Sequence, residues 1–130
     1  MTSFKGGILL LNQVCVLTIK VKEMKESLSF YTEVFDFTVS KKYSEKIVSL
    51  VHKNIPIVLE EDNSINLSDS KSVLLGISSK NIGHDFKLLK NRGANVLFDE
   101  PEPCPPGLYF IVEDPSGNQL EVVEFTNEEQ

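Results

Sequence analysis

The 130-residue sequence predicts an α+β fold in which one βαβββ pattern occurs twice. Each half opens with an alternating apolar segment, continues with a helical apolar period and ends with three short extended segments. A polar stretch separates the halves, and superposing them aligns Val16 with Leu74 and Glu60 with Glu121. We expect one domain over residues 1–130, with module one at about 10–62, a linker at about 61–72 and module two at about 72–125.

The first half begins with a strand and a helix. Residues 14–21 alternate, which predicts one apolar face of Leu17, Ile19 and Val21 and an opposite face of Val16, Thr18 and Lys20. Residues 22–35 change to a helical period, with one face formed by Met24, Leu28, Tyr31 and Phe35. Three strands are expected next, at 37–43, 46–52 and 55–61, separated by Ser44-Glu45 and by a turn at Lys53-Asn54.

The second half repeats this order after the polar stretch. A strand is expected at 72–79, and a helix over 81–93 carries Ile82, Phe86 and Leu89 on one face. Gly93 stands where a left-handed residue ends a helix. A short strand at 94–100 is followed by the proline-rich stretch "PEPCPPG", which we expect to be a loop because proline cannot donate ladder hydrogen bonds. A final hairpin is built around "PSGN".

Composition excludes several classes of protein. The net charge of −6 speaks against a nucleic-acid partner. The stretch "GGILLLNQVCVLTIKV" is apolar, but Asn12, Gln13 and Lys20 interrupt it, so a buried strand is expected rather than a membrane span. No signal-peptide pattern opens the chain, which favours the cytoplasm, and Cys15 and Cys104 are expected as free thiols.

Three motifs resemble the vicinal oxygen chelate superfamily. They are the strand–helix entry "VLTIKVKEMKESLSFYTEVFDF", the helix end "LLKNRGANV" and the turn and strand "EDPSGNQLEVVE". That superfamily includes glyoxalase I, extradiol dioxygenases, and the bleomycin and fosfomycin resistance proteins. The resemblance covers about residues 10–125. It implies that the two modules form a half-open barrel-like sheet around a pocket with the helices outside, and that the protein is a homodimer.

The resemblance also implies four positions at which related proteins hold a metal. Here they fall on Val16, Glu60, Leu74 and Glu121. Valine and leucine have no lone pair to donate, and two carboxylates alone hold a hard cation only weakly, through waters. A shift of register by one residue offers only Cys15 as a new donor, and His52 and His84 are expected at the surface or at a helix cap. We therefore predict no metal; the alternative is a divalent ion held by Glu60 and Glu121.

Strand alternation extends the predicted ligand pocket beyond those four positions. The complete set is Val16, Thr18, Val58, Glu60, Leu74, Tyr109, Ile111, Gln119, Glu121 and Val123. Tyr109 can equally be a core or interface aromatic. The two glutamates have three possible roles: solvated groups in a wet pocket, partners of a cationic or hydrogen-bond-donating ligand, or a metal-free acid or base.

The leading hypothesis is a metal-independent small-molecule-binding protein of the bleomycin-resistance kind, without catalytic residues. The acidic balance suits a cationic compound or antibiotic, although no tryptophan is available to stack on a planar drug. The alternative is a metalloenzyme of the same superfamily, either a glyoxalase-like lyase or isomerase or a dioxygenase. A structural or regulatory dimer is a third class.

Overall fold

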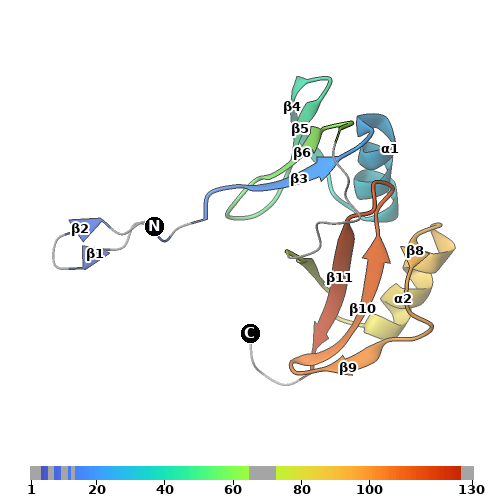
Figure 1. Cartoon of the computed structure of the whole chain (residues 1–130). Helices are drawn as coiled ribbons and strands as arrows, with labels where there is room; N and C mark the ends of the chain where they lie inside the picture. Colours follow the sequence, from blue (N-terminus) through green and yellow to red (C-terminus); the bar gives the residue numbers. More distant parts are fainter. Residues whose placement is uncertain (1–3, 6–7, 10–11, 13, 65–72, 127–130) are drawn as a thin grey trace.

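The computed structural model describes residues 4–5, 8–9, 12, 14–64 and 73–126. The predicted linker therefore lies mostly outside the described residues. Near the N-terminus, strands β1 (Phe4–Lys5) and β2 (Ile8–Leu9) form a separate two-stranded antiparallel sheet, which lies apart from the rest of the fold in Figure 1. No helix in the described part of the chain is long and apolar enough to cross a membrane.

Module one has the predicted βαβββ order. It contains strand β3 (Leu17–Val21), helix α1 (Met24–Ser29), a π-helical continuation (Phe30–Val34), and strands β4 (Val39–Ser44), β5 (Ile47–Leu50) and β6 (Ile57–Glu61). Its sheet has the order β3-β6-β5-β4, with β3 parallel to β6 and the other pairs antiparallel. Strand β3 is consequently an edge strand.

Module two repeats the order with one additional strand. It contains β7 (Leu75–Ser78), α2 (Ile82–Asn91), β8 (Asn95–Val96), β9 (Glu102–Cys104), β10 (Gly107–Glu113) and β11 (Gln119–Phe125). The sheet order is β7-β11-β10-β8, with β9 also paired to β10, and β7 runs parallel to β11. The fold class is α+β, with one sheet and one helical segment per module and without a closed barrel among these strands.

Both helices cover the same side of the molecule (Figure 1). Beneath them lies a core of alternate strand residues, in which Leu59, Leu120 and Val122 are almost completely buried, as the alternation predicts. The helix residues predicted to face inward, such as Ile82, Phe86 and Leu89, are buried as well, except for Leu28, which is only partly buried. The other face of each sheet carries most of the predicted pocket residues, and no helix of the described residues packs on it (Figure 1).

The structure corrects three local predictions. The first helix is not uniformly α-helical, because its last turn widens into a π-helix from Phe30, where Phe35 N–H bonds to the Phe30 carbonyl. The apolar N-terminal run is not one buried strand: β3 starts only at Leu17, and Val14 and Val16 are exposed. The strand predicted at 94–100 shortens to the two residues of β8.

The proline-rich stretch was predicted to be a loop, and this is wrong for its first half. Glu102–Cys104 forms β9, in which Pro103 lies opposite Leu108 of β10. A proline is compatible with this strand because β9 is at the edge of the sheet, where one side of the backbone needs no ladder donor. Gly93 and the last hairpin behave as predicted: Gly93 has a φ of 88° after α2, and Gly117 has a φ of 97° in the "PSGN" turn.

Candidate functional site

A cavity of about 280 Å³ lies where the two modules meet. Edge strand β3 forms one wall, and β7 with the start of β11 forms the other. The described residues that line it are Leu17, Thr18, Ile19, Lys20, Tyr31, Val73, Leu74, Leu75, Gly76, Asn118, Gln119 and Leu120. Aliphatic side chains make up most of this wall, and a few polar groups are placed among them. This combination is typical of a site for a small organic molecule.

The "DPSGN" turn fixes one end of this cavity. Asp114, which is 4% exposed, accepts hydrogen bonds from the backbone N–H groups of Ser116 (2.9 Å) and Asn118 (2.8 Å). It also accepts from Asn118 Nδ2 and from the hydroxyl of Tyr31, each at 2.9 Å. A buried carboxylate is stable only with such partners, so the turn is held in one conformation.

The same turn joins module two to module one through three hydrogen bonds. Tyr31 donates to Asp114, the N–H of Lys22 donates to Ser116 Oγ (2.8 Å), and Asn118 Nδ2 donates to the Lys20 carbonyl (2.8 Å). Burial, followed by the nearby Asp114 carboxylate, raises the pKa of Tyr31 far above its usual value, so the phenol stays protonated as a donor. These bonds fix the distance between β3 and the start of β11 and therefore shape the cavity.

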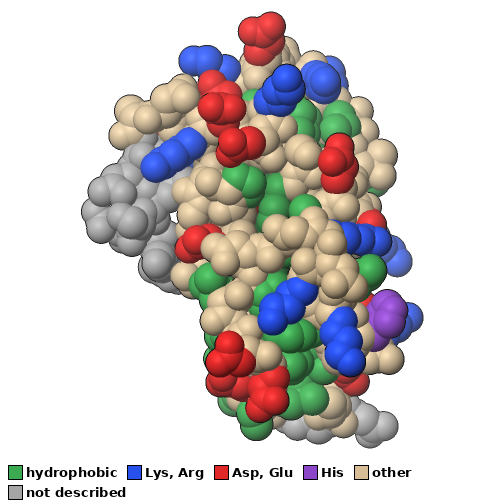
Figure 2. All heavy atoms as spheres, turned by 90° about the vertical axis from the view of Figure 1, so that its right-hand side faces the viewer, with side chains coloured by type: hydrophobic (Ala, Val, Ile, Leu, Met, Phe, Trp, Pro, Cys, Tyr) green, Lys and Arg blue, Asp and Glu red, His purple; other side chains and the backbone are tan. Residues whose placement is uncertain are grey.

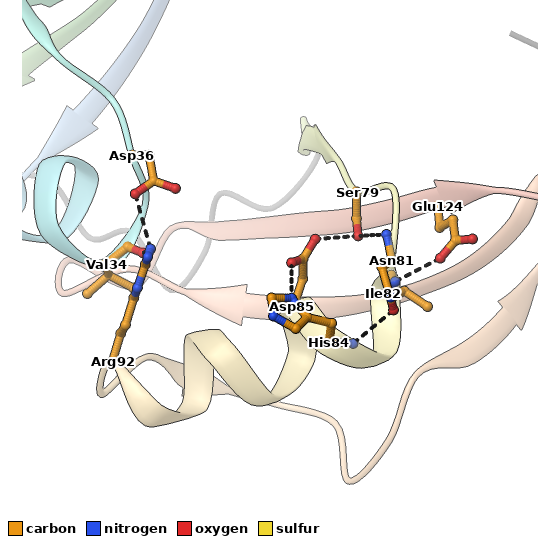
Figure 3. A network of polar contacts seen from close by, with 9 residues as sticks. All are labelled: Val34, Asp36, Ser79, Asn81, Ile82, His84, Asp85, Arg92 and Glu124. Atoms are coloured by element: carbon orange, nitrogen blue, oxygen red, sulfur yellow. Dashed lines mark hydrogen bonds and ion pairs between the residues drawn. The ribbon is translucent and has the colours of Figure 1, made fainter.

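A second connection between the modules lies on the helix-bearing side, at the end of α2. In Figure 3 the guanidinium of Arg92 reaches the end of the π-helix and the loop after it. Its Nη1 donates to the Val34 carbonyl (2.9 Å) and to Asp36 Oδ1 (3.1 Å). Acidic and basic side chains are interspersed over this side of the molecule (Figure 2). Among the described residues on this side, neither sign of charge forms the continuous patch that a phosphate backbone requires.

One ion pair stands beside the cavity. Lys20 Nζ lies 2.8 Å from Glu60 Oε1, because the parallel register of β3 and β6 sets these two residues side by side. The pair is partly solvated, with side-chain exposures of 47% for Lys20 and 38% for Glu60. The hydrogen bond to Glu60 raises the pKa of Lys20, so the ammonium is charged at neutral pH. Lys20 lines the cavity, whereas Glu60 does not.

The structure brings only part of the predicted pocket to the cavity. Thr18, Leu74 and Gln119 line it. The remaining predicted residues are distributed over the strands of both sheets: Val58 and Glu60 on β6, Tyr109 and Ile111 on β10, Glu121 and Val123 on β11, and Val16 just before β3. Ile111 and Val123 are buried, and Tyr109 packs edge-to-face on Phe98 at 5.1 Å.

The four positions implied for a metal do not provide a suitable set of donors. Val16 and Leu74 offer no lone pair, and Glu60 is already paired with Lys20. The strand register places Glu60 beside Lys20 and not beside Val16. Val16 lies four residues before Lys20, which is roughly 13 Å along an extended chain. Within the described ranges no three His, Cys, Asp or Glu side chains are grouped as metal ligands. The residues at these positions therefore do not fit a resident transition metal.

Neither histidine is among the described residues that line the cavity. His52 is exposed, with Nδ1 3.2 Å from the Ile55 carbonyl oxygen. In Figure 3, His84 and Ser79 contact different oxygens of Asp85. His84 Nδ1 lies 3.1 Å from Asp85 Oδ1, and Ser79 Oγ donates to Asp85 Oδ2 at 2.6 Å. The carboxylate stands between the imidazole and the hydroxyl, so the imidazole cannot take the serine proton directly. Cys15 and Cys104 are free thiols.

Another, more open groove of about 490 Å³ lies between α1 and β4–β5, lined by Met24, Lys25, Leu28, Lys42, Ser44, Glu45 and Val48. It is larger than the cavity, but it lies within module one, is more exposed to solvent and is not bounded by the turn. We take the inter-module cavity as the candidate site because both modules and the "DPSGN" turn build it.

The most informative residues that sequence reasoning missed are Lys20, Tyr31 and Asn118. Strand alternation places Lys20 on the same face as Thr18, which was assigned to the pocket. The same signal could therefore have identified Lys20 as a pocket residue. Tyr31 was assigned to the helix core, where it is fully buried, but it also lines the cavity and donates to Asp114. Asn118 belongs to the motif that carried the resemblance, and no pattern in the sequence connects it to Lys20.

Two βαβββ modules, joined by a turn and enclosing a cavity between their edge strands, define a class of small α+β proteins that bind or transform small molecules. This chain belongs to the Glyoxalase/Bleomycin resistance protein/Dioxygenase superfamily, whose profile matches residues 11–122. Among curated proteins, no sequence matches the chain.

Solved structures of similar fold come from several bacteria. A glyoxalase-related enzyme from Fulvimarina pelagi shares 20% identity over 88% of both chains, with a TM-score of 0.71. TnmS3, an antibiotic-binding protein from Streptomyces sp. CB03234, shares 20% identity over 89% of this chain and 98% of its own, with a TM-score of 0.70. Lactoylglutathione lyase from Agrobacterium tumefaciens shares 14% identity over 87% of this chain and 93% of its own, with a TM-score of 0.68. At these identities the likeness concerns the fold alone.

Proposed function

We propose that this protein binds a small organic molecule in the cavity between β3 and β7–β11, without a resident metal and without chemistry on its ligand. The observation that carries the proposal is the wall of the cavity, in which the described residues combine aliphatic side chains with Thr18, Lys20 and Gln119 and include no metal-donor set. The described part of the chain also groups no nucleophile with a base there. Membership of a superfamily that includes binding proteins supports this reading.

The volume sets the scale of the ligand. A cavity of about 280 Å³ lies just below the range of about 300–1,000 Å³ in which drug-sized ligands bind, which favours a compact molecule. The structural likeness to an antibiotic-binding protein is compatible with this role. The fold is also similar to that of a lyase, but the described residues include no set of metal-donating side chains. No observation therefore favours the metalloenzyme alternative over binding.

We also propose that the protein is a cytoplasmic homodimer. Two free thiols suit a reducing compartment. Exposed apolar side chains adjoin the cavity: Val73 (79%) and Leu74 (41%) line it, and Val14 (70%) stands three residues before β3. A contiguous exposed apolar surface is commonly covered by a partner subunit. Light scattering coupled to size exclusion would give twice the chain mass of 14.6 kDa; a single-chain mass would contradict the dimer.

A thermal-shift screen of compact metabolites and antibiotics tests the binding function, with Thr18→Phe as the matched control. Thr18 is exposed and lines the cavity, so phenylalanine fills the site without disturbing the core. A true ligand at about 100 times its Kd stabilises the wild type by roughly 2.7 kcal/mol and the variant much less. Stabilisation of both proteins to the same extent would contradict binding in this cavity.

A further inference from the structure

We propose that the ligand of this cavity carries an anionic group, a carboxylate or a similar oxyanion, and that Lys20 binds it. The inference rests on the proposed function, because it names the chemical class of molecule that occupies the same site. It reverses the expectation of a cationic ligand that the acidic composition suggested.

The charge on the cavity wall favours an anion. Among the described residues that line the cavity, Lys20 alone carries a charge at neutral pH. Tyr31 is neutral, and its hydroxyl proton is committed to Asp114. The two carboxylates expected to attract a cation are not part of this wall, and one of them, Glu60, is held by Lys20 itself.

Lys20 retains capacity for a ligand. An ammonium group has three N–H donors, and Glu60 accepts one of them at 2.8 Å. The ion pair is solvated on both sides, and exposed pairs of this kind contribute little, so a ligand carboxylate can share the ammonium with Glu60 or replace it. Carboxylate and ammonium form charge-assisted hydrogen bonds, which are stronger than those between neutral groups.

Two neutral groups can complete the binding of an oxyanion. The Thr18 hydroxyl and the Gln119 amide line the cavity, and the described part of the chain provides neither side chain with a hydrogen-bond partner. Thr18 and Lys20 share one face of β3, with Cα atoms roughly 6.6 Å apart, so one carboxylate can reach both. The exposed aliphatic side chains of Val73 and Leu74, just before β7, then contact the apolar part of the ligand.

The position of Glu121 orients such a ligand. Its Oε2 lies 3.6 Å from the place where a Cβ on Gly76 would stand, so this carboxylate is over β7. Lys20 is at the other strand and beside the turn, because its carbonyl accepts the hydrogen bond from Asn118. An anionic group is therefore expected at the β3 wall, next to the turn, and the neutral end of the molecule toward Gly76.

Matched pairs of acids and amides test this proposal. Benzoate and hexanoate are titrated beside benzamide and hexanamide, and the dissociation constants are measured from backbone amide shifts of the wild type. We expect the acids to bind more tightly than the amides. Lys20→Gln should weaken acid binding by roughly two- to five-fold and leave the amides unchanged. Glu60→Gln should strengthen acid binding by a similar factor, because it releases the ammonium.

Lys87→Gln serves as the control, since Lys87 is exposed on α2 and does not line the cavity; it should change neither series. Amides that bind as tightly as acids, or an acid affinity indifferent to Lys20→Gln, would overturn the anion proposal while leaving the binding function intact. Absence of any shift at 17–20, 73–76 and 118–120 with both series would count against the proposed function as well.

Discussion

Asp114 shows how much of this site depends on single residues. Its buried carboxylate has four hydrogen-bond donors, three from its own turn and one from Tyr31 of the other module. A buried carboxylate with these partners is tolerated, whereas the loss of one donor leaves part of its desolvation cost uncompensated. The Tyr31–Asp114 bond is therefore both a stability element and a spacer between the modules.

The first prediction concerns Tyr31→Phe. At pH 7 the variant should lose about 1–3 kcal/mol of unfolding free energy, measured by urea denaturation, because the Asp114 carboxylate loses a buried donor. Folding raises the pKa of Tyr31 above its unfolded value near 10, so the associated stability is complete below pH 10 and decreases as the pH rises above it. The difference between the two proteins should therefore shrink between pH 10 and pH 11, and a constant difference would contradict this account.

A second residue-scale prediction concerns Ser27 of α1. The side chain is fully buried, and no donor or acceptor in the described ranges pairs with its hydroxyl. Ser27→Ala removes this unsatisfied group and introduces a better helix former, so the unfolding free energy should stay the same or rise by up to about 1 kcal/mol. Ser29→Ala, which removes an exposed contact to Glu33, is the control. A loss above about 1 kcal/mol for Ser27→Ala would show that its hydroxyl is bonded.

At the scale of elements, the sequence predicted most of the secondary structure. Alternation located β3, β6 and β11, and the helical period located α2 with its buried face. The misses have physical reasons. Pro103 lies in a strand because an edge position does not require its N–H, and edge position is a property of the sheet and not of the segment. The π-helix at Phe30 leaves the apolar period nearly unchanged, so the pattern cannot detect it.

Gly107 gives a prediction at this scale. It starts β10, where a Cβ would overlap the Glu124 carbonyl oxygen and lie 2.7 Å from Thr126 N. Backbone atoms of β11 cannot move aside easily, so Gly107→Ala should cost about 1–3 kcal/mol in unfolding free energy. Gly76→Ala on β7 is the matched control, since its Cβ would meet Glu121 at an ordinary 3.6 Å. Equal stability of the two variants, determined by thermal and urea unfolding, would refute this packing argument.

For the whole molecule, the resemblance predicted the arrangement of the two modules, and the structure adds where a cavity lies between them. The predicted pocket residues were chosen by strand face, and this selected Thr18 and Gln119 together with residues that do not line the cavity. A face assignment cannot show that β3 and β7 are edge strands that meet across a cavity. Nor can it show that the β3–β6 register pairs Lys20 with Glu60. These features depend on how the modules pack, which involves residues far apart in sequence.

The central claim, that the cavity between the modules is the ligand site, is tested most directly by chemical-shift mapping. A stabilising compound from the screen is titrated into ¹⁵N-labelled protein, and the backbone amide shifts are recorded. We predict that the largest changes cluster at residues 17–20, 73–76 and 118–120, and that Thr18→Phe suppresses them. Changes centred instead on the groove between α1 and β4, near Met24 and Lys42, would contradict the claim.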